Sequence, residues 1–288
     1  MKTKEIKEVV KSRYGQCAEI GGGEESCCCP SEITSSLSFA AEHGLYNQEE
    51  LSLIPKIARD LSRGCGNPTG FANLQPDETV VDFGCGAGID VILAAHKIGP
   101  GGKVVGIDFT PQMIERTKQA IEEADLTRMV ELRVSDMGRL ELPNDFADVV
   151  ISNCVINLCP DKEAVYREAF RILKPGGRVA ISDIVYTEKI NPHIEEHFQS
   201  TWAGCVGGAI DEDSYFRIVR EVGFRQINVV SDHPLPPKEL EAMASCPGKE
   251  FTPAPAKEDL ALVQDKVTSI KFTAAKPFMD QRKRKPTH

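Results

Sequence analysis

The sequence lacks three features that would place it in common classes of protein. It has no run of about 18 apolar residues, which excludes an ordinary transmembrane helix. Its formal net charge is −9, so a broad basic surface for a nucleic-acid backbone is not expected. No two of its ten cysteines have the C-x₂-C spacing, so a structural zinc site is not expected either. Neither a membrane nor a nucleic acid is therefore predicted as a partner.

A secretion signal is also missing from the start of the sequence. The first residues, MKTKEIKEVVKSRYG, are charged and have helical periodicity, and neither an apolar core region nor a small-residue cleavage site follows them. The basic stretch QRKRKPTH at the other end is of the kind that usually stays solvated. We therefore expect a soluble, cytoplasmic protein.

From residue 79 the sequence alternates short β-rich runs with helical segments. This pattern is typical of an α/β fold, here a Rossmann-like, doubly wound parallel sheet with helices on both faces. We predict an N-terminal helical and cysteine-rich segment (1–74), a Rossmann-like ligand-binding domain (75–186) and a C-terminal α+β portion on the substrate side (187–288). The alternating segments are TVVDFG, GIDVILAAHKI, KVVGIDF, PQMIERTKQAIEEAD, VELRVSD, ADVVISN, DKEAVYREAFRILK and GRVAISDIV.

The sequence outside this alternation predicts further elements. We expect a helix over 1–14, a loop rich in glycine and cysteine over 16–32, and a helix over 49–61 opened by a capping box of Asn47 and Glu50. Thr110 and Pro111 should cap and begin a helix, and Lys174-Pro-Gly-Gly should end one. Later segments predict helices over 192–204 and 211–223, strands over 227–231 and 268–277, and a loop over 233–258.

A glycine-rich turn follows the first strand of the alternation, in VVDFGCGAG (80–88). Glycines let a backbone approach a ligand closely where a strand meets a helix. Their spacing is G-x-G-x-G and not the G-x-G-x-x-G that cradles a pyrophosphate. Asp108 ends the next strand, where it can accept hydrogen bonds from ribose hydroxyls. The pattern indicates a nucleoside ligand without a pyrophosphate.

These motifs in order resemble the class I S-adenosylmethionine-dependent methyltransferases over residues 75–185. The motifs are DFGCGAG, Asp108, Asp136 after the third strand, Asn153 after the fourth, and LKPGG before the fifth. The resemblance implies S-adenosylmethionine as cofactor. It implies that Asp108 binds the ribose, that Asp136 approaches the adenine amino group, and that Asn153 belongs to the cofactor site. The residues implied at the methionine end are Asp82, Gly84, Gly86 and Gly88, and those implied at the adenine are Met113 and Met137.

The cysteines add a second and closer resemblance. Cys154 lies in the segment after the fourth strand, and in this fold that segment usually lies beside the transferred methyl group. The segments GCGNP, SNCVINL and W-x-G-C-V-x-G-A resemble those of arsenite methyltransferases along nearly the whole chain. The resemblance implies arsenite or methylarsenite as substrate, held by thiolates of Cys65, Cys154 and Cys205. It also implies that Cys28 or one of its neighbours is a redox cysteine that pairs with Cys65, reset by a thiol reductant such as thioredoxin or glutathione.

The chemistry of trivalent arsenic suits three thiolates. It is a soft centre, and thiolate is the soft ligand that proteins have. Its lone pair can attack a methyl carbon without a general base, which agrees with six histidines that lie outside the acceptor motifs. Methylation oxidises arsenic, and two thiols can return two electrons by forming a disulfide.

Two other readings stay open on the sequence alone. One is a small-molecule methyltransferase of the quinone or sterol type in which the cysteines are incidental, and the other is a thiol-based metal-binding module. Cys17, Cys85, Cys159 and Cys246 have no supporting motif, and a cysteine without one is usually a small buried hydrophobe. The vicinal Cys27, Cys28 and Cys29 fit redox work, arsenic capture or no function.

Overall fold

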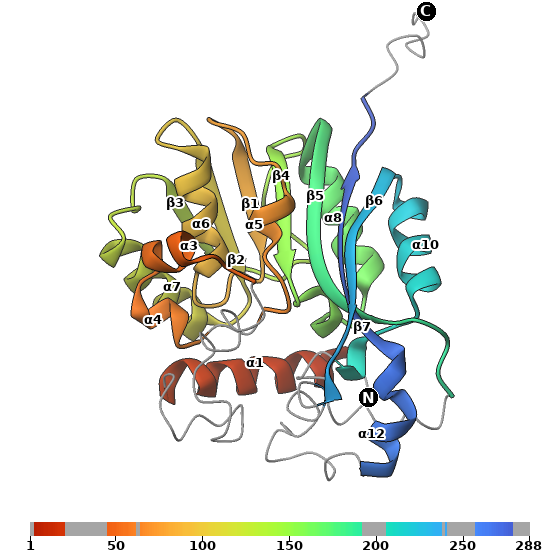
Figure 1. The fold of residues 1–288 in the computed structure, drawn as a ribbon. Helices are drawn as coiled ribbons and strands as arrows, with labels where there is room; N and C mark the ends of the chain where they lie inside the picture. The colour runs from red at the N-terminus through yellow and green to blue at the C-terminus, as the bar shows by residue number, and fades with distance from the viewer. Residues whose placement is uncertain are drawn as a thin grey trace, which may run out of the picture.

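The computed structural model describes residues 3–20, 45–61, 64–191, 206–237, 240 and 257–278. Its centre is a seven-stranded sheet in the order β3-β2-β1-β4-β5-β7-β6 (Figure 1). Strands β1 to β5 are parallel, and β7 runs antiparallel to both of its neighbours. The strands are β1 (Thr79–Phe83), β2 (Lys103–Asp108), β3 (Val130–Val134), β4 (Ala147–Asn153), β5 (Leu173–Tyr186), β6 (Arg225–Pro234) and β7 (Val267–Ala275). The predicted Rossmann-like fold is confirmed.

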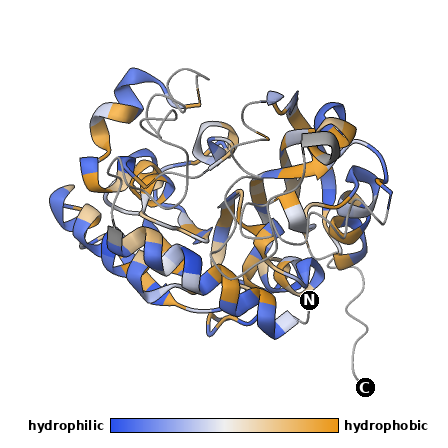
Figure 2. Cartoon of the chain, turned by 90° about the horizontal axis from the view of Figure 1, so that it is seen from below, coloured by the Kyte–Doolittle hydropathy of each residue, from blue (hydrophilic) through white to orange (hydrophobic). Residues whose placement is uncertain are grey.

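Helices cover both faces of the sheet because successive strand residues point to opposite sides. Val80 packs in one core with α3, α6 and α7, whereas Val81 packs in a second core with α8 and α10. In Figure 2 the helices carry hydrophilic and hydrophobic residues together, as amphipathic helices do. The described α-helices are α1 (Thr3–Ile20), α3 (Gln48–Leu53), α4 (Lys56–Arg59), α5 (Pro68–Phe71), α6 (Ile89–Ile98), α7 (Pro111–Glu123), α8 (Lys162–Ile172), α10 (Glu212–Val222) and α12 (Lys257–Val263). In the part of the chain that the structure describes, no helix is long and apolar enough to cross a membrane.

The N-terminal helix is longer than predicted. We expected it to end at residue 14, but α1 continues to Ile20 and includes Gly15. A Cβ at Gly15 would lie 3.3 Å from the side chain of Gln112 on α7. The glycine therefore allows close packing of α1 on α7 and does not end the helix.

The predicted helix over 49–61 is two short helices. The capping box of Asn47 and Glu50 is confirmed, and it opens α3. Pro55 then separates α3 from α4. Proline has no N–H to donate and disfavours helical backbone at the residue before it, so a single helix could not continue through Ile54.

Other boundaries agree with the sequence in part. Helix α7 begins at Pro111 as predicted, although the Thr110 side chain makes no capping hydrogen bond. Helix α8 ends at Ile172 and β5 begins at the next residue, so the expected cap at 174–177 lies within the strand. Helix α10 and strands β6 and β7 are confirmed. The predicted helix over 192–204 and most of the predicted loop over 233–258 lie outside the described residues.

Candidate active site

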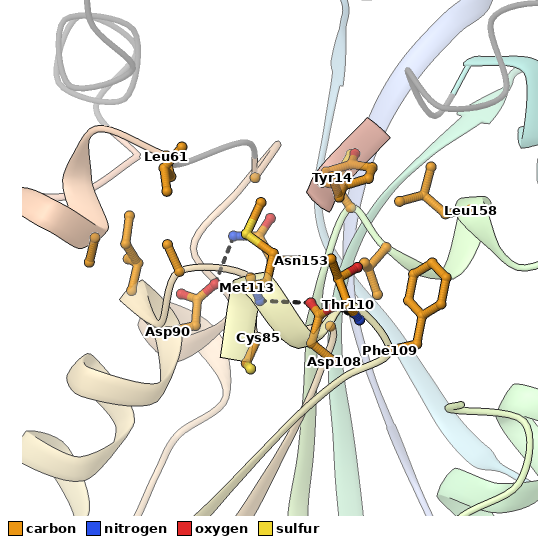
Figure 3. Close-up of a pocket in the computed structure, with 18 of the residues that line it drawn as sticks. Tyr14, Leu61, Cys85, Asp90, Asp108, Phe109, Thr110, Met113, Asn153 and Leu158 are labelled. Atoms are coloured by element: carbon orange, nitrogen blue, oxygen red, sulfur yellow. Dashed lines mark hydrogen bonds between the residues drawn. The ribbon is translucent and has the colours of Figure 1, made fainter. Parts of the chain in front are cut away.

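A cleft lies at the carboxyl ends of the parallel strands, between β1 and β4. The chain order reverses at this point of the sheet, which is where open α/β sheets bind ligands. The space in and around its mouth is about 770 Å³, and part of that space is open to solvent. The glycine turn after β1, the ends of β2 and β4, and Tyr14 of α1 line it (Figure 3).

The glycine turn shapes one wall of the cleft. Gly84, Gly86 and Gly88 all have positive φ, of 76°, 52° and 97°. A Cβ at Gly84 would meet Val155 at 2.4 Å and one at Gly88 would meet Thr117 at 2.7 Å, whereas one at Gly86 would meet nothing within 4 Å. Gly86 therefore opens directly onto the cleft, where a ligand can contact its backbone.

Three buried carboxyl groups lie at the cleft, two in its lining (Asp90 and Asp108) and one behind it (Asp82). Burial raises the pKa of Asp90 to about 6. Burial, followed by the charges of Asp90 and Asp108, raises the pKa of Asp82 well above its usual value. Burial also raises the pKa of Asp108, although this carboxylate accepts hydrogen bonds from the Gly86 and Thr110 N–H groups at 3.1 and 2.9 Å. Such a site favours a ligand with positive charge, because a cation would stabilise the ionised carboxylates.

The residues expected to bind the cofactor do not all line the cleft. Those that line it are Gly84, Gly86, Asp108, Met113, Met137 and Asn153. Asp82 lies behind the lining and is only 2% exposed. Gly88 packs against Thr117, and Asp136 forms an ion pair with Lys7 of α1. The expected contact between Asp136 and adenine stays a prediction, since in this structure the partner of its carboxylate is Lys7.

Cys154 lies directly after β4 and lines the cleft. It is only 3% exposed, and its φ of 61° is unusual for a residue that is not glycine. The Ser182 carbonyl accepts a hydrogen bond from its N–H at 2.7 Å. Backbone strain of this kind is often kept at functional sites.

The turn that carries Cys65 packs against the same region. Cys65 is partly buried and contacts the hydrophobic cluster that contains Cys154 and Val206. Its Sγ lies 3.5 Å from the Ser182 Oγ. Two of the three predicted arsenic ligands therefore approach one residue of β5, from turns that are far apart in the sequence.

The other predicted thiols cannot be placed in the same way. Cys205 and Cys28 lie outside the described residues. Val206, the neighbour of Cys205, is fully buried in the cluster with Cys154. The Tyr186 hydroxyl donates a hydrogen bond to the Val206 carbonyl at 3.1 Å.

The cysteines without a motif differ among themselves. Cys85 is buried between Thr117 and Gly106, as expected for a packing residue. Burial raises the pKa of the Cys159 thiol to about 12, which disfavours a thiolate there. Cys17 is disulfide-bonded, so our expectation of a plain buried thiol is wrong for this residue. Among the described residues no three His, Cys, Asp or Glu side chains are grouped to hold a metal ion.

Sequence reasoning missed several residues that line the cleft. Tyr14 reaches it from α1, and Tyr46 donates a hydrogen bond to Asp90 at 3.2 Å. Asp90 had a usable signal, because it follows the glycine turn at the first turn of α6. The two tyrosines had none, since only the tertiary fold brings residues 14 and 46 to the ends of the strands.

The sheet order, the glycine turn and its carboxylates define a Rossmann-like α/β protein that binds a nucleoside. A family model described as a methyltransferase domain matches residues 74–223. The chain belongs to this family. The open space at Gly86 and the buried carboxylates fit S-adenosylmethionine, the cofactor that the sequence predicts, because it carries a positively charged sulfonium and an ammonium group.

Individual relatives are more specific. An arsenite methyltransferase of Halobacterium salinarum is 38% identical over 236 residues, covering 78% of this chain and 59% of the relative. A demethylmenaquinone methyltransferase of Lactobacillus johnsonii is 28% identical and covers 49% of this chain and 60% of its own length. The crystal structure of CrArsM, an arsenic(III) S-adenosylmethionine methyltransferase of Chlamydomonas reinhardtii, has a TM-score of 0.66, is 25% identical, and covers 81% of this chain and 74% of that one. The chain thus spans about 59% of the length of the first of these relatives.

Proposed function

We propose that this protein methylates trivalent arsenic, taken up as arsenite or methylarsenite, with S-adenosylmethionine as the methyl donor. The observation that carries the proposal is the approach of the Cys65 and Cys154 turns to Ser182 beside the cofactor cleft. The similarity to the arsenite methyltransferase of Halobacterium salinarum supports it.

The thiolates would hold the substrate in place. Arsenite is neutral at pH 7, so no cationic group is needed to attract it, and sulfur ligands select the soft atom. Cys154 lines the cleft itself, so arsenic bound there would lie close to the cofactor. S-adenosylmethionine, when bound, supplies a methyl group on a positively charged sulfur. Fixed geometry then contributes much of the rate, because the two reacting atoms are held in line.

The electrons of the reaction balance through the thiols. The arsenic lone pair forms the new arsenic–carbon bond, and the pair of the broken carbon–sulfur bond stays on the cofactor sulfur. Arsenic is thereby oxidised from the trivalent to the pentavalent state. Two thiols, proposed as Cys65 and Cys28 or one of its neighbours, return two electrons as they form a disulfide. Thioredoxin, glutathione or another thiol then reduces that disulfide.

A quinone- or sterol-type methyltransferase is the second candidate. The demethylmenaquinone methyltransferase matches only about half of this chain. A methyltransferase of the quinone or sterol type does not need cysteines at its site. This candidate therefore does not explain why the turns of Cys65 and Cys154 both contact Ser182. We therefore favour arsenic as the substrate.

Turnover assays on cysteine variants test the proposal. Incubation of the protein with arsenite, S-adenosylmethionine and a thiol should give methylated arsenic. Cys154→Ser and Cys205→Ser should lower the rate by at least about a hundredfold, because a hydroxyl is a poor ligand for a soft centre. Both variants should bind the cofactor with nearly unchanged affinity by calorimetry, and Cys159→Ser serves as the control, at a free cysteine outside the cleft lining. Cofactor binding without any methylated arsenic from the wild-type protein would contradict the proposal.

A further inference from the structure

Three polar side chains hold the Cys65 turn against the sheet. Asn153 ends β4, Ser182 lies in β5 and Ser269 lies in β7, and these three strands are adjacent. The Ser269 hydroxyl donates a hydrogen bond to the Cys65 carbonyl at 3.1 Å. The turn thus contacts three neighbouring strands, β4, β5 and β7, although it precedes the first strand in sequence.

Asn153 makes the most specific of these contacts. Its Oδ1 accepts a hydrogen bond from the Gly66 N–H at 3.1 Å, and its Nδ2 donates one to the Gly66 carbonyl at 2.8 Å. A planar amide that both accepts from and donates to one residue fixes the orientation of that residue as well as its distance. Nδ2 also donates to Asp90 Oδ2 at 2.9 Å, a contact that Figure 3 shows at the cleft.

The glycines on either side of Cys65 permit this close approach. A Cβ at Gly64 would lie 2.3 Å from Asn153 Nδ2, and one at Gly66 would lie 2.2 Å from the Ser182 Oγ. Neither distance leaves room for a side chain. The motif G-C-G therefore lets the backbone lie directly on the asparagine and the serine, which sets the position of the cysteine between the two glycines.

Ser182 links the two cysteines. It is fully buried, and its hydroxyl lies 3.5 Å from the Cys65 Sγ. Its carbonyl accepts the hydrogen bond from the Cys154 N–H. One residue of β5 thus contacts the Cys65 side chain and the Cys154 backbone.

We propose that Asn153 and Ser182 are positioning residues that hold the Cys65 thiol within bridging distance of the Cys154 thiol. The inference rests on the proposed function, in which one arsenic atom needs both sulfurs. It gives Asn153 a role toward the thiols in addition to its place in the cleft lining, because its Nδ2 donates a hydrogen bond to the carbonyl of Gly66, the neighbour of Cys65. The family resemblance had suggested only the cofactor side.

A thiol cross-linking experiment without cofactor or arsenic tests the proposal. The full-length, reduced protein is treated with dibromobimane, which bridges two nearby thiols, and the tryptic peptides joined through Cys65 and Cys154 are measured by mass spectrometry. The initial rate of this cross-link should fall about tenfold in Ser182→Ala, the size expected for losing roughly one buried hydrogen bond, and by more than that in Asn153→Ala, which loses several. Ser152→Ala is the matched control, because Ser152 is the buried neighbour of Asn153 and bonds the Phe83 carbonyl instead.

The outcomes separate this inference from the proposed function. Unchanged cross-linking in both variants would overturn it, as would an equal loss in Ser152→Ala or no cross-link in the wild-type protein. Ser182→Ala removes a single oxygen atom, so a folded variant is available for the measurement even where Asn153→Ala loses stability, and a thermal melt identifies that case. A wild-type protein that cross-links as expected but never methylates arsenite would leave the positioning role standing and would refute arsenic as the substrate.

Discussion

At the scale of single residues, the site is governed by buried polar groups rather than by exposed charge. Asp90 and Asp183 are both buried with a pKa of about 6, yet they lie in different surroundings. Asp90 borders the cofactor cleft and bonds Tyr46 and Asn153. Asp183 accepts a hydrogen bond from the hydroxyl of Tyr215 on α10 at 2.9 Å, and it is not among the residues that line the cleft.

The raised pKa of Asp183 predicts a dependence of stability on pH. Burial raises this pKa from 3.8 to about 6, and the charge of Lys162 opposes the shift. Between about pH 4 and pH 6 the native carboxyl keeps its proton while the unfolded one loses it, so the free energy of unfolding falls as pH rises. The loss in the free energy of unfolding from this group is on the order of 3 kcal/mol, and the loss is complete above about pH 6.

Urea unfolding at a series of pH values measures this effect. Asp183→Asn should remove its part of the decline between pH 4 and 6, so the curves for wild type and variant should diverge in that window. Asp213→Asn, an exposed acid on α10, is the control and should follow the wild type. Parallel curves for wild type and Asp183→Asn would show that Asp183 has no such pKa.

At the scale of elements, α1 packs both on the cluster that contains Cys154 and on the cluster that contains the cleft residue Met113. Its first half contributes Ile6 and Val10 to the cluster that contains Cys154. Its second half contributes Cys17 and Ala18 to a cluster with Met113, a cleft residue. Figure 1 shows α1 running along the edge of the sheet where the parallel strands end.

Contacts that fix α1 against the rest of the protein should slow the release of the cofactor from the cleft. Lys7 pairs with Asp136 after β3, and the two side chains are 43% and 44% exposed. A pair this exposed contributes little, so Lys7→Ala should speed cofactor release only about threefold. Stopped-flow displacement of bound cofactor measures the rate, and the difference should shrink at high salt. Lys11→Ala, an exposed lysine on the same helix, should release the cofactor at the wild-type rate.

The sequence predicted elements where one local signal decided them. Alternating apolar runs predicted β1 to β5, and the G-x-G-x-G turn with Asp108 predicted residues that line the cleft at the ends of β1 and β2. Local patterns failed where packing decided the result. Gly15 resembled a helix end but allows α1 to pack on Gln112, and the partner of Asp136 is a lysine more than a hundred residues away. The insertion of β7 between β5 and β6 depends on pairing over long separations, which no short pattern encodes.

At the scale of the whole molecule, charge should distinguish the two ligands. The chain has a net charge of −9 and concentrates buried carboxylates around the cleft. The cofactor carries a net positive charge, whereas arsenite is neutral at pH 7. Added salt should therefore weaken cofactor binding and leave arsenite binding nearly unchanged.

Calorimetry at low and high salt checks this expectation. Between roughly 50 and 500 mM sodium chloride the cofactor affinity should fall about twofold to fivefold, while arsenite affinity should change less than that. S-adenosylhomocysteine, which lacks the sulfonium charge, is the control ligand and should respond less than S-adenosylmethionine. A larger effect of salt on arsenite than on the cofactor would mean that arsenic binds as an anion, against the thiolate account.

X-ray absorption at the arsenic edge tests the central claim most directly, because it counts the sulfur atoms bound to arsenic. The reduced protein with one equivalent of arsenite should give three arsenic–sulfur bonds. Each of Cys65→Ser, Cys154→Ser and Cys205→Ser should reduce the count to two. Arsenic surrounded by oxygen, or a sulfur count that none of the three substitutions changes, would contradict the account.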